Sequence, residues 1–196
     1  MNGDAFSASD VLMDRPRPSW ALAVAWAGRW PVACVMAGAM LVALGAQVRV
    51  PLPGTDVPMT LQGLAVLLAG LVLPPGQSAV ALLLYLACGA AGLPVFAAGS
   101  SGMLGPTGGY LVGFVLAAPL IGAIGGGGAA CFWRMLAAGT VGQAAIFLLG
   151  VGWRVLYSSG DVAFALATGL LPFLPKAGLV AVLAATAVTA LRGRRR

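Results

Sequence analysis

The chain has 196 residues, of which 60% are hydrophobic and only 8% are charged, and its formal net charge is +6. An ordinary soluble domain carries about 25% charged residues, and a soluble fold with so few charges would expose apolar patches that aggregate. The composition therefore excludes an ordinary soluble domain and favours a membrane protein surrounded by lipid. The 29 glycines suit close helix packing in a bilayer, and the length favours one compact bundle.

The net positive charge does not indicate a nucleic-acid partner. The basic residues flank apolar segments or gather at the C-terminus, as topology signals do in membrane proteins. We therefore expect no contact with nucleic acid. The C-terminal group consists of Arg192, Arg194, Arg195 and Arg196.

Residues 1–30 predict a polar N-terminal tail that leads into an interfacial segment. Trp20, Trp26 and Trp30 stand among alanines in the second half of this stretch. Because tryptophan prefers the headgroup level of a bilayer, we expect this part to lie at the membrane surface, before the first span.

Six apolar segments predict an all-α fold, a polytopic membrane protein built as a bundle of six transmembrane helices. They form a single domain over residues 31–192, followed by a basic cytoplasmic tail at 193–196. Several segments are shorter than the roughly 20 residues that a perpendicular span needs. Two explanations of the short segments are open: the helices extend into the glycine-rich loops, or the protein encloses a cavity at one face. A count of five or seven spans also stays open. The segments lie at about 31–48, 60–74, 77–92, 109–125, 132–153 and 170–191.

The fifth segment is the clearest span. Phe132, Trp133 and Arg134 open it, and Trp153 and Arg154 close it. A helix from 133 to 153 is about 30 Å long at a rise of about 1.5 Å per residue, which matches the hydrocarbon thickness of a bilayer. We expect aromatic belts and snorkelling arginines at both of its ends.

The arginines also predict the orientation. With six spans, both termini share one side with Arg134 and with the arginines of the two tails, whereas Arg49, Arg154 and Lys176 fall on the other side. Cytoplasmic segments carry the excess of basic residues, so we expect the protein in the inner (plasma) membrane with both termini in the cytoplasm. The longer loops, at 49–59, 93–108 and 154–171, then face outward.

The sequence contains no motif for catalysis or nucleotide binding. No G-x-x-x-x-G-K-[ST] phosphate loop occurs, and a chain without His or Glu has no His-based triad. Cys34, Cys88 and Cys131 each lie alone in an apolar stretch, without the spacing of a zinc site. We therefore expect no enzymatic activity, no metal site and no bound cofactor.

The first outer loop is rich in proline and ends in a polar motif. From Arg49 to Gln62 it reads RVPLPGTDVPMTLQ, in which Pro58-x-Thr60-x-Gln62 opens a helix. Thr60 has two interpretations. It caps the N-terminus of that helix, or it lies with Gln62 near a ligand as a hydrogen-bonding group.

The second outer loop, from Gly92 to Tyr110, is uncharged and rich in glycine. Glycine lets backbone approach a ligand closely, and non-helical backbone at the membrane is tolerated where it lines a cavity or is buried in protein. The loop is therefore either part of a ligand site or a tight re-entrant turn without a ligand.

Two sequence blocks in this region resemble a known family. VPMTLQGLAVLLAG at 57–70 and LYLACGAAGLPVFAAGSSGMLGPTGGYLVGF at 84–114 are similar to the signature of the BioY family, the biotin-specific S components of energy-coupling factor (ECF) transporters. The resemblance runs from about 37 to 125 and is weaker through the last two helices. It implies a six-helix membrane bundle that binds biotin at its outer face, under the outer loops.

The resemblance also implies partner proteins. An S component works with a transmembrane T subunit and two ATPase subunits, whose ATP hydrolysis drives toppling of the S component and inward release of the vitamin. S components contact the T subunit through small residues of the first helix, in an AxxxA pattern. Such residues permit close helix approach in lipid, so packing within the chain is an equal interpretation. Here the spacing occurs at Ala33/Ala37 and Ala39/Ala43.

Biotin as the implied ligand suggests a role for each candidate side chain. Phe96 and Tyr110 would form apolar walls, and the carboxylate needs a cation or well-aimed N–H groups. The available cations on the outer side are Arg49, Arg154 and Lys176. Hydrogen bonds to the ligand would come from Thr60, Gln62, Thr107 and the backbone at Gly108 and Gly109.

The chain departs from the family at the start of the last helix. The family has a Pro-Gly-Asp-x-x-Lys stretch whose Asp and Lys contact the ligand, whereas residues 171–179 read LPFLPKAGL. We favour an alignment that removes four residues and makes Lys176 the family lysine. The ungapped alignment instead places Ala177 at the position of the family Asp and Val180 at the position of the family Lys. Both lack the family aspartate, for which Asp161 is a candidate substitute.

We therefore expect a membrane substrate-capture (S) component for biotin uptake, with no nucleotide site of its own. An S component for another small vitamin is the first alternative. A structural membrane subunit that binds no ligand is the second alternative, and a membrane enzyme ranks below both because the catalytic residues are missing.

Overall fold

The computed structural model describes residues 31–97, 102–126 and 131–193. The predicted tail and interfacial segment at 1–30 lie outside the described residues, as does the end of the basic tail at 194–196. The described chain is mostly helical. Its elements in order are α3 (Pro31–Gln47), β1 (Arg49–Val50), β2 (Met59–Thr60), α4 (Gln62–Val72), α5 (Pro75–Ala90), η1 (Gly102–Leu104), α6 (Gly108–Gly125), α7 (Phe132–Tyr157), α8 (Val162–Gly169), η2 (Leu171–Phe173) and α9 (Leu174–Gly193).

Three stretches of the described chain are long and apolar enough to cross a membrane. They are α6, α7 and the stretch from Val162 to Leu191, and α3, α4 and α5 are apolar helices of 10–17 residues. Large apolar side chains cover the outer surface: Leu44, Leu116 and Leu148 are 61%, 56% and 76% exposed. In water such a surface would aggregate, whereas in a bilayer it faces a solvent of matching polarity.

The centre of the bundle is α6, which packs against α4, α5 and α7. Glycines allow the close approach. A Cβ at Gly113 would lie 3.0 Å from the Cα of Ile146 in α7, and a Cβ at Gly122 would lie 2.9 Å from the carbonyl oxygen of Gly70 in α4. Contacts between small residues are a main source of helix association in lipid.

Prolines separate α4 from α5. Leu73 and Pro74 have extended backbone, and Pro75 is the first residue of α5, where its missing N–H costs no helical hydrogen bond. The reversal of direction between α4 and α5 therefore needs only a two-residue connection.

The end of α6 is held by an arginine of α7. The Nε of Arg134 donates to the carbonyl of Ile124 in the last turn of α6, at 2.6 Å.

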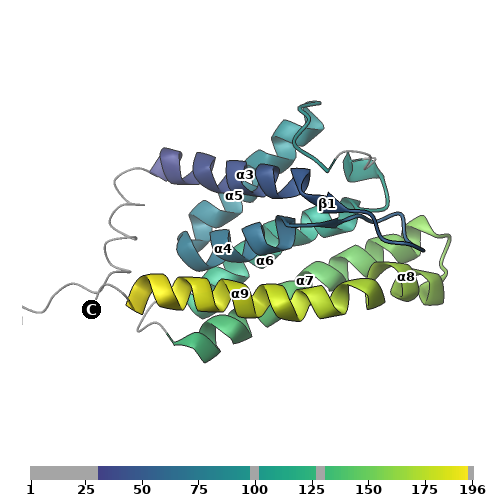
Figure 1. Cartoon of the computed structure of the whole chain (residues 1–196). Helices are drawn as coiled ribbons and strands as arrows, with labels where there is room; N and C mark the ends of the chain where they lie inside the picture. Colours follow the sequence, from purple (N-terminus) through teal and green to yellow (C-terminus); the bar gives the residue numbers. More distant parts are fainter. Residues whose placement is uncertain (1–30, 98–101, 127–130, 194–196) are drawn as a thin grey trace, which may run out of the picture.

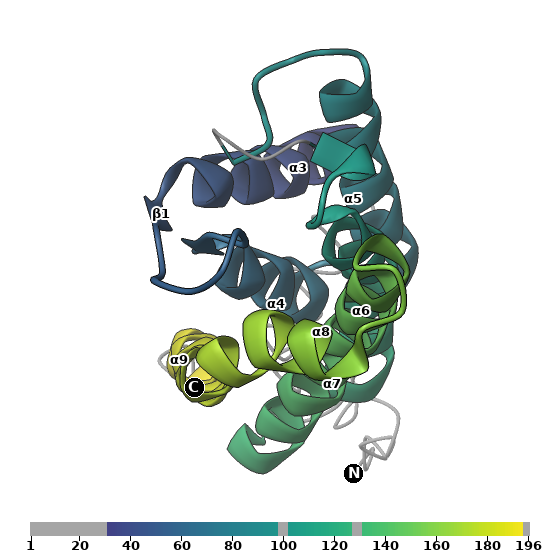
Figure 2. The same cartoon turned by 90° about the vertical axis from the view of Figure 1, so that its right-hand side faces the viewer.

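The two ends of the bundle differ in what they contain (Figure 1). The beginning of α3 and the end of α9 lie at one end, on the left of the view. The β1–β2 hairpin, η1 and α8 gather at the other end, which we call the loop end. Figure 2 looks onto the loop end and shows α8 and the start of α9 below α4, with the hairpin to one side.

Two features at the loop end correct the predictions. The proline-rich loop is closed by a short antiparallel ladder, in which Arg49 pairs with Thr60. The stretch 154–171, predicted as a loop, is mostly helical because α7 continues to Tyr157 and α8 fills 162–169. Ser159 and Gly160 have φ of 57° and 95°, and this left-handed backbone ends α7.

Candidate ligand-binding site

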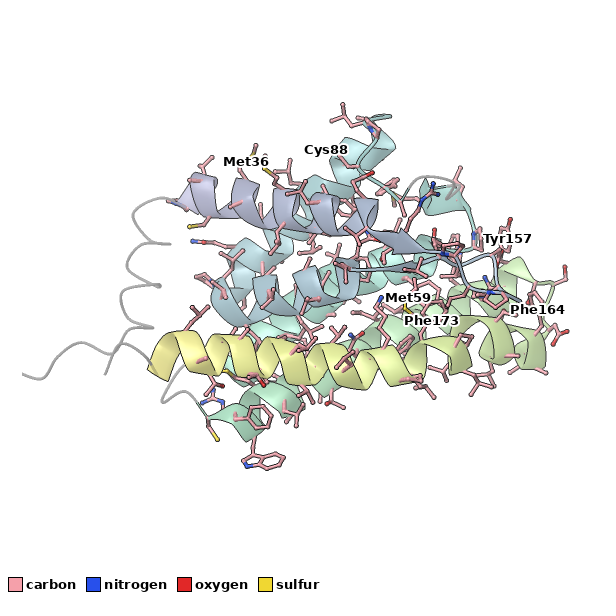
Figure 3. All side chains as sticks on the ribbon, viewed as in Figure 1. Met36, Met59, Cys88, Tyr157, Phe164 and Phe173 are labelled. Atoms are coloured by element: carbon pink, nitrogen blue, oxygen red, sulfur yellow. The ribbon has the colours of Figure 1, made fainter. Side chains whose placement is uncertain are left out.

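A pocket opens at the loop end, among the β1–β2 hairpin, α4, α6, α7 and α9. It contains about 730 Å³ of empty space, part of it open to solvent. Apolar and aromatic side chains make up most of its wall, which is typical of small-molecule sites. One of them, Phe173 of η2, is labelled in Figure 3. The lining side chains that can hydrogen-bond include Thr60, Gln62, Thr107, Tyr110, Gln143 and Lys176.

The polar motif after β2 forms a hydrogen-bonded chain. The hydroxyl of Thr60 donates to Oε1 of Gln62 at 3.0 Å, and Nε2 of Gln62 donates to the hydroxyl of Tyr85 at 2.7 Å. Gln62 is only 5% exposed, so these bonds hold its amide in one orientation. The interpretation of Thr60 as a helix cap is wrong, because Leu61 occupies the cap position of α4 and no side chain bonds there.

Lys176 reaches across the pocket from the first turn of α9. Its Nζ donates to the backbone carbonyl of Thr60, next to the hydrogen-bonded chain. Among the described residues it is the only lysine or arginine in the pocket lining. Arg49 and Arg154, the other two candidate cations, do not line the pocket.

Phe96 forms an aromatic wall because a glycine makes room for it. A Cβ at Gly89 of α5 would lie 2.1 Å from the ring of Phe96, and this contact is possible only without a side chain. The ring of Phe96 meets that of Tyr85 edge to face, with centroids 5.5 Å apart. That geometry is the favourable one for aromatic pairs.

Tyr110 is held in position by a hydrogen bond and by a close contact with a glycine. Its hydroxyl donates to the carbonyl of Gly169 at the end of α8, at 2.7 Å. Its ring lies against Gly150 of α7, where a Cβ would come within 2.2 Å. The ring therefore serves as pocket wall and as a link between α6, α7 and α8.

Gly108 and Gly109 do not line the pocket. They bring the start of α6 against its neighbours: a Cβ at Gly108 would lie 2.0 Å from the carbonyl oxygen of Met103, and one at Gly109 would lie 2.2 Å from the Cβ of Trp153. Trp153 in turn donates from Nε1 to the carbonyl of Gly105 at 2.9 Å. These glycines therefore allow Met103 and Trp153 to pack closely against the start of α6.

Arg154 corrects the prediction of a snorkelling arginine at the end of α7. The residue is 2% exposed and does not reach the lipid interface. Its Nη1 donates to Oδ1 of Asp56 at 2.8 Å, and its Nη2 donates to the hydroxyl of Thr168 at 2.6 Å. A buried arginine needs such partners, because an unpaired buried charge is strongly destabilising.

Gln143 is a pocket residue that the sequence analysis missed. It lies in the middle of α7 and is 8% exposed. Its Nε2 lies 3.5 Å from the position of a Cβ on Gly63, where α4 begins. A lone amide within an apolar membrane segment was the available signal, since polar groups at such positions are costly and tend to be functional.

The remaining candidates lie away from the pocket. Asp161 caps α8, where its side chain accepts from the N–H of Phe164 at 2.8 Å, and it does not replace the family aspartate in the lining. Ala33 and Ala37 are exposed on α3. Met36 of the same helix points outward in Figure 3. Ala39 is buried in the core and Ala43 packs against it.

Comparisons with known proteins agree with one another. The BioY family model matches residues 22–196. A probable biotin transporter BioY from Pyrococcus horikoshii is 39% identical over 137 residues, which cover 68% of this chain and 78% of that protein. The biotin transporter BioY of Thermotoga maritima is 39% identical over 136 residues, with the same coverage of 68% and 78%.

A solved structure supports the same relationship. The crystal structure of the S-component for biotin from an ECF-type ABC transporter superposes with a TM-score of 0.71 at 25% identity, covering 84% of this chain and 91% of that chain. The family match extends through the described fold and includes every element that builds the pocket. The chain is a membrane protein and belongs to the BioY family.

Proposed function

We propose that the chain is the substrate-capture (S) component of a biotin importer and that it binds biotin in the pocket at the loop end. One observation carries the proposal. In a chain of the BioY family, an apolar pocket is crossed by one amine, Lys176, which is held against the backbone carbonyl of Thr60. The relatives named as biotin transporters support biotin as the ligand.

The polar groups of the pocket suit the two ends of biotin. Lys176 lies in the first turn of α9, near the loop end, and an ammonium there can pair with the carboxylate of the ligand. Gln62 and Gln143 offer neutral amides, and a neutral ureido ring costs less to desolvate than a carboxylate does. We therefore assign the ureido ring to the amides and the carboxylate to Lys176.

The apolar wall suits the middle of the ligand. Phe96, Tyr110 and Phe114 also line the pocket, and they offer ring faces to the thiophane ring and the aliphatic tail. Thr107 lines the pocket as well, but its hydroxyl has a long bond of 3.4 Å to the carbonyl of Gly102. That hydroxyl is therefore available as a further donor.

The membrane arrangement that we propose has six spans and cytoplasmic termini. The described chain begins and ends at the same end of the bundle (Figure 1), which favours an even number of spans. The helices α3, α4 and α5 would cross as short spans. The pocket then faces outward, and the end that bears Arg134 faces the cytoplasm, in line with the excess of basic residues there.

Import would require partners, since the sequence has no phosphate loop. We propose a T subunit and two ATPase subunits, with α3 as the contact for the T subunit. Ala33 and Ala37 are exposed and suited to that contact, whereas Ala39 is buried within the bundle. The purified chain alone should hydrolyse no ATP.

The decisive experiment is equilibrium binding of labelled biotin to the detergent-purified chain, with desthiobiotin and thiamine as competitors. Tight binding that desthiobiotin displaces and thiamine does not would support the proposal. A folded chain that binds no biotin would refute it. Displacement by thiamine instead would indicate an S component for another vitamin.

A further inference from the structure

The loop between β1 and β2 is anchored on a buried arginine. Arg154 of α7 is 2% exposed, and its Nη1 donates to Oδ1 of Asp56 in the loop at 2.8 Å. Its Nη2 donates to the hydroxyl of Thr168 in α8 at 2.6 Å. The guanidinium carbon also lies 5.5 Å from the ring centre of Phe164 in α8. One side chain of α7 therefore joins the neighbouring helix α8 to a loop residue 98 positions away in the sequence.

A second hydrogen bond joins the loop to Thr168, and it comes from Thr55, the residue before Asp56. The hydroxyl of Thr55 donates to the backbone carbonyl of Thr168 at 2.7 Å and accepts from the N–H of Val57 at 3.1 Å. Thr55 and Asp56 thus both attach to Thr168, one directly and one through Arg154. Together these residues form what we call the loop clamp.

The loop that the clamp holds is part of the pocket wall. Val57 and Pro58 line the pocket directly after the two anchored residues. By contrast, Pro51, Pro53 and Gly54 on the other side of the anchors are exposed. Val57 is 6% exposed and belongs to the core, and Leu52 packs against that core, so the clamp adds to this packing in holding the wall.

Arg154 does not act as a ligand cation in this arrangement. It does not line the pocket, and both of its terminal nitrogens have partners in the protein. The opposite walls are helices packed in the core, whereas the loop reaches that core through Leu52, Val57 and Met59. Its exposed Gly54 has a φ of +80°, a conformation that glycine adopts without strain.

We infer that Arg154 is a positioning residue and that its pair with Asp56 holds the Thr55–Pro58 wall closed over the ligand. This inference rests on the proposed function. Opening of the wall is a step in both entry and exit, so loosening the clamp raises both rates. Affinity changes little, because the groups that contact the ligand are unaltered.

The test is Asp56→Asn, which keeps the size of the side chain and removes its charge. Association and dissociation of labelled biotin are followed on the purified full chain. Asparagine keeps an oxygen that can accept the bond but loses the charge of this half-exposed pair, which should raise both rates by about fivefold and change Kd by less than about twofold. The matched control is Asp161→Asn, the same change at the exposed cap of α8, where no rate should change.

Salt gives a readout that a purely structural role would not change. Asp56 is 52% exposed, so salt screens its pair with Arg154. Higher ionic strength should speed biotin exchange in the wild type and leave Asp56→Asn unchanged. A slower association in Asp56→Asn, or a dissociation rate equal to that of the wild type, would overturn the inference.

Hydrogen exchange of the ligand-free protein separates failure of the clamp from failure of the proposed function. Amides at 54–57 should exchange faster in Asp56→Asn than in the wild type and in Asp161→Asn. If the wild type binds no biotin, the proposed function falls, and this exchange still decides whether the clamp exists. Equal exchange in all three proteins would refute the clamp.

Discussion

The loop end and the opposite end of the bundle are held together by different kinds of contact. At the loop end, Tyr110 and Trp153 donate hydrogen bonds to the distant backbone carbonyls of Gly169 and Gly105. At the opposite end, helices meet through small residues: a Cβ at Gly70 would lie 2.7 Å from a backbone oxygen of α6. The loop end therefore combines long-range hydrogen bonds with glycine contacts such as that of Gly150 with Tyr110, whereas the contacts around Gly70 are steric alone.

This difference separates ligand binding from stability. Hydrogen bonds hold side chains in a defined direction, which a binding site needs. Close packing of small residues tolerates no added volume, and it contributes to association of the helices in lipid. Changes to the side chains that line the pocket should therefore alter affinity more than folding, and changes at the opposite end should do the reverse.

The largest expected effect is at Lys176. Lys176→Ala removes the pocket amine, and we expect biotin affinity to fall by about 100-fold, the loss typical of a desolvated charge pair. The protein should still insert and run as a folded species. Equilibrium binding of biotin and of biotin amide should also show that the variant no longer prefers the free carboxylate. A preserved preference would exclude Lys176 as the carboxylate partner.

The opposite end should respond to Gly70→Ala. The added Cβ would lie 2.7 Å from the carbonyl oxygen of Ala118 and 2.9 Å from the Cβ of Ile121, and such overpacking costs about 1–3 kcal/mol. Thermal unfolding in detergent should occur at a lower temperature, while the folded fraction binds biotin normally. Gly76→Ala is the control, since a Cβ there meets nothing within 4 Å. Equal unfolding temperatures in both variants would contradict this account of the opposite end.

A smaller effect is expected at Gln143. Gln143→Leu removes a neutral hydrogen-bonding group from the pocket and should lower biotin affinity by about tenfold, as for one lost bond to a neutral group. The preference for biotin over biotin amide should stay intact, in contrast to Lys176→Ala. Thr140→Val, on the exposed side of the same helix, should bind as the wild type does. If Gln143→Leu no longer preferred biotin over biotin amide, the ligand carboxylate would lie at the side chain of Gln143 instead of at Lys176.

The smallest effect is expected at Arg49. This arginine is exposed in β1 and does not line the pocket, although the sequence made it a candidate cation. Arg49→Ala should change the Kd for biotin by less than about twofold. A tenfold loss in the same binding assay would show that the carboxylate extends to the hairpin.

Local patterns were sufficient to place several helices. The apolar segments at 77–92 and 109–125 correspond to α5 (Pro75–Ala90) and α6 (Gly108–Gly125). Hydropathy missed α8, which is too short to stand out from the apolar run after it. The turn signal was present, because Gly160 and Asp161 supply a left-handed helix end and a helix cap.

The pocket residues divide in a similar way. Phe96, Tyr110 and Lys176 were predicted through the family resemblance, and they line the pocket; their contact with a ligand stays a prediction. Arg154 was misplaced because its partner, Asp56, lies 98 residues away in the sequence. Gln143 was overlooked because no local motif surrounds it.

The sequence by itself determined that lipid surrounds this chain, that it is mostly helical and that it resembles the BioY family. Composition, hydropathy and turn residues act over a few neighbours, so they can be read directly from the order of the amino acids. Only the tertiary structure decided which polar groups face the pocket and which face each other. A buried amine, amide or guanidinium must be satisfied by whatever the folded chain brings near, and that depends on contacts between distant segments.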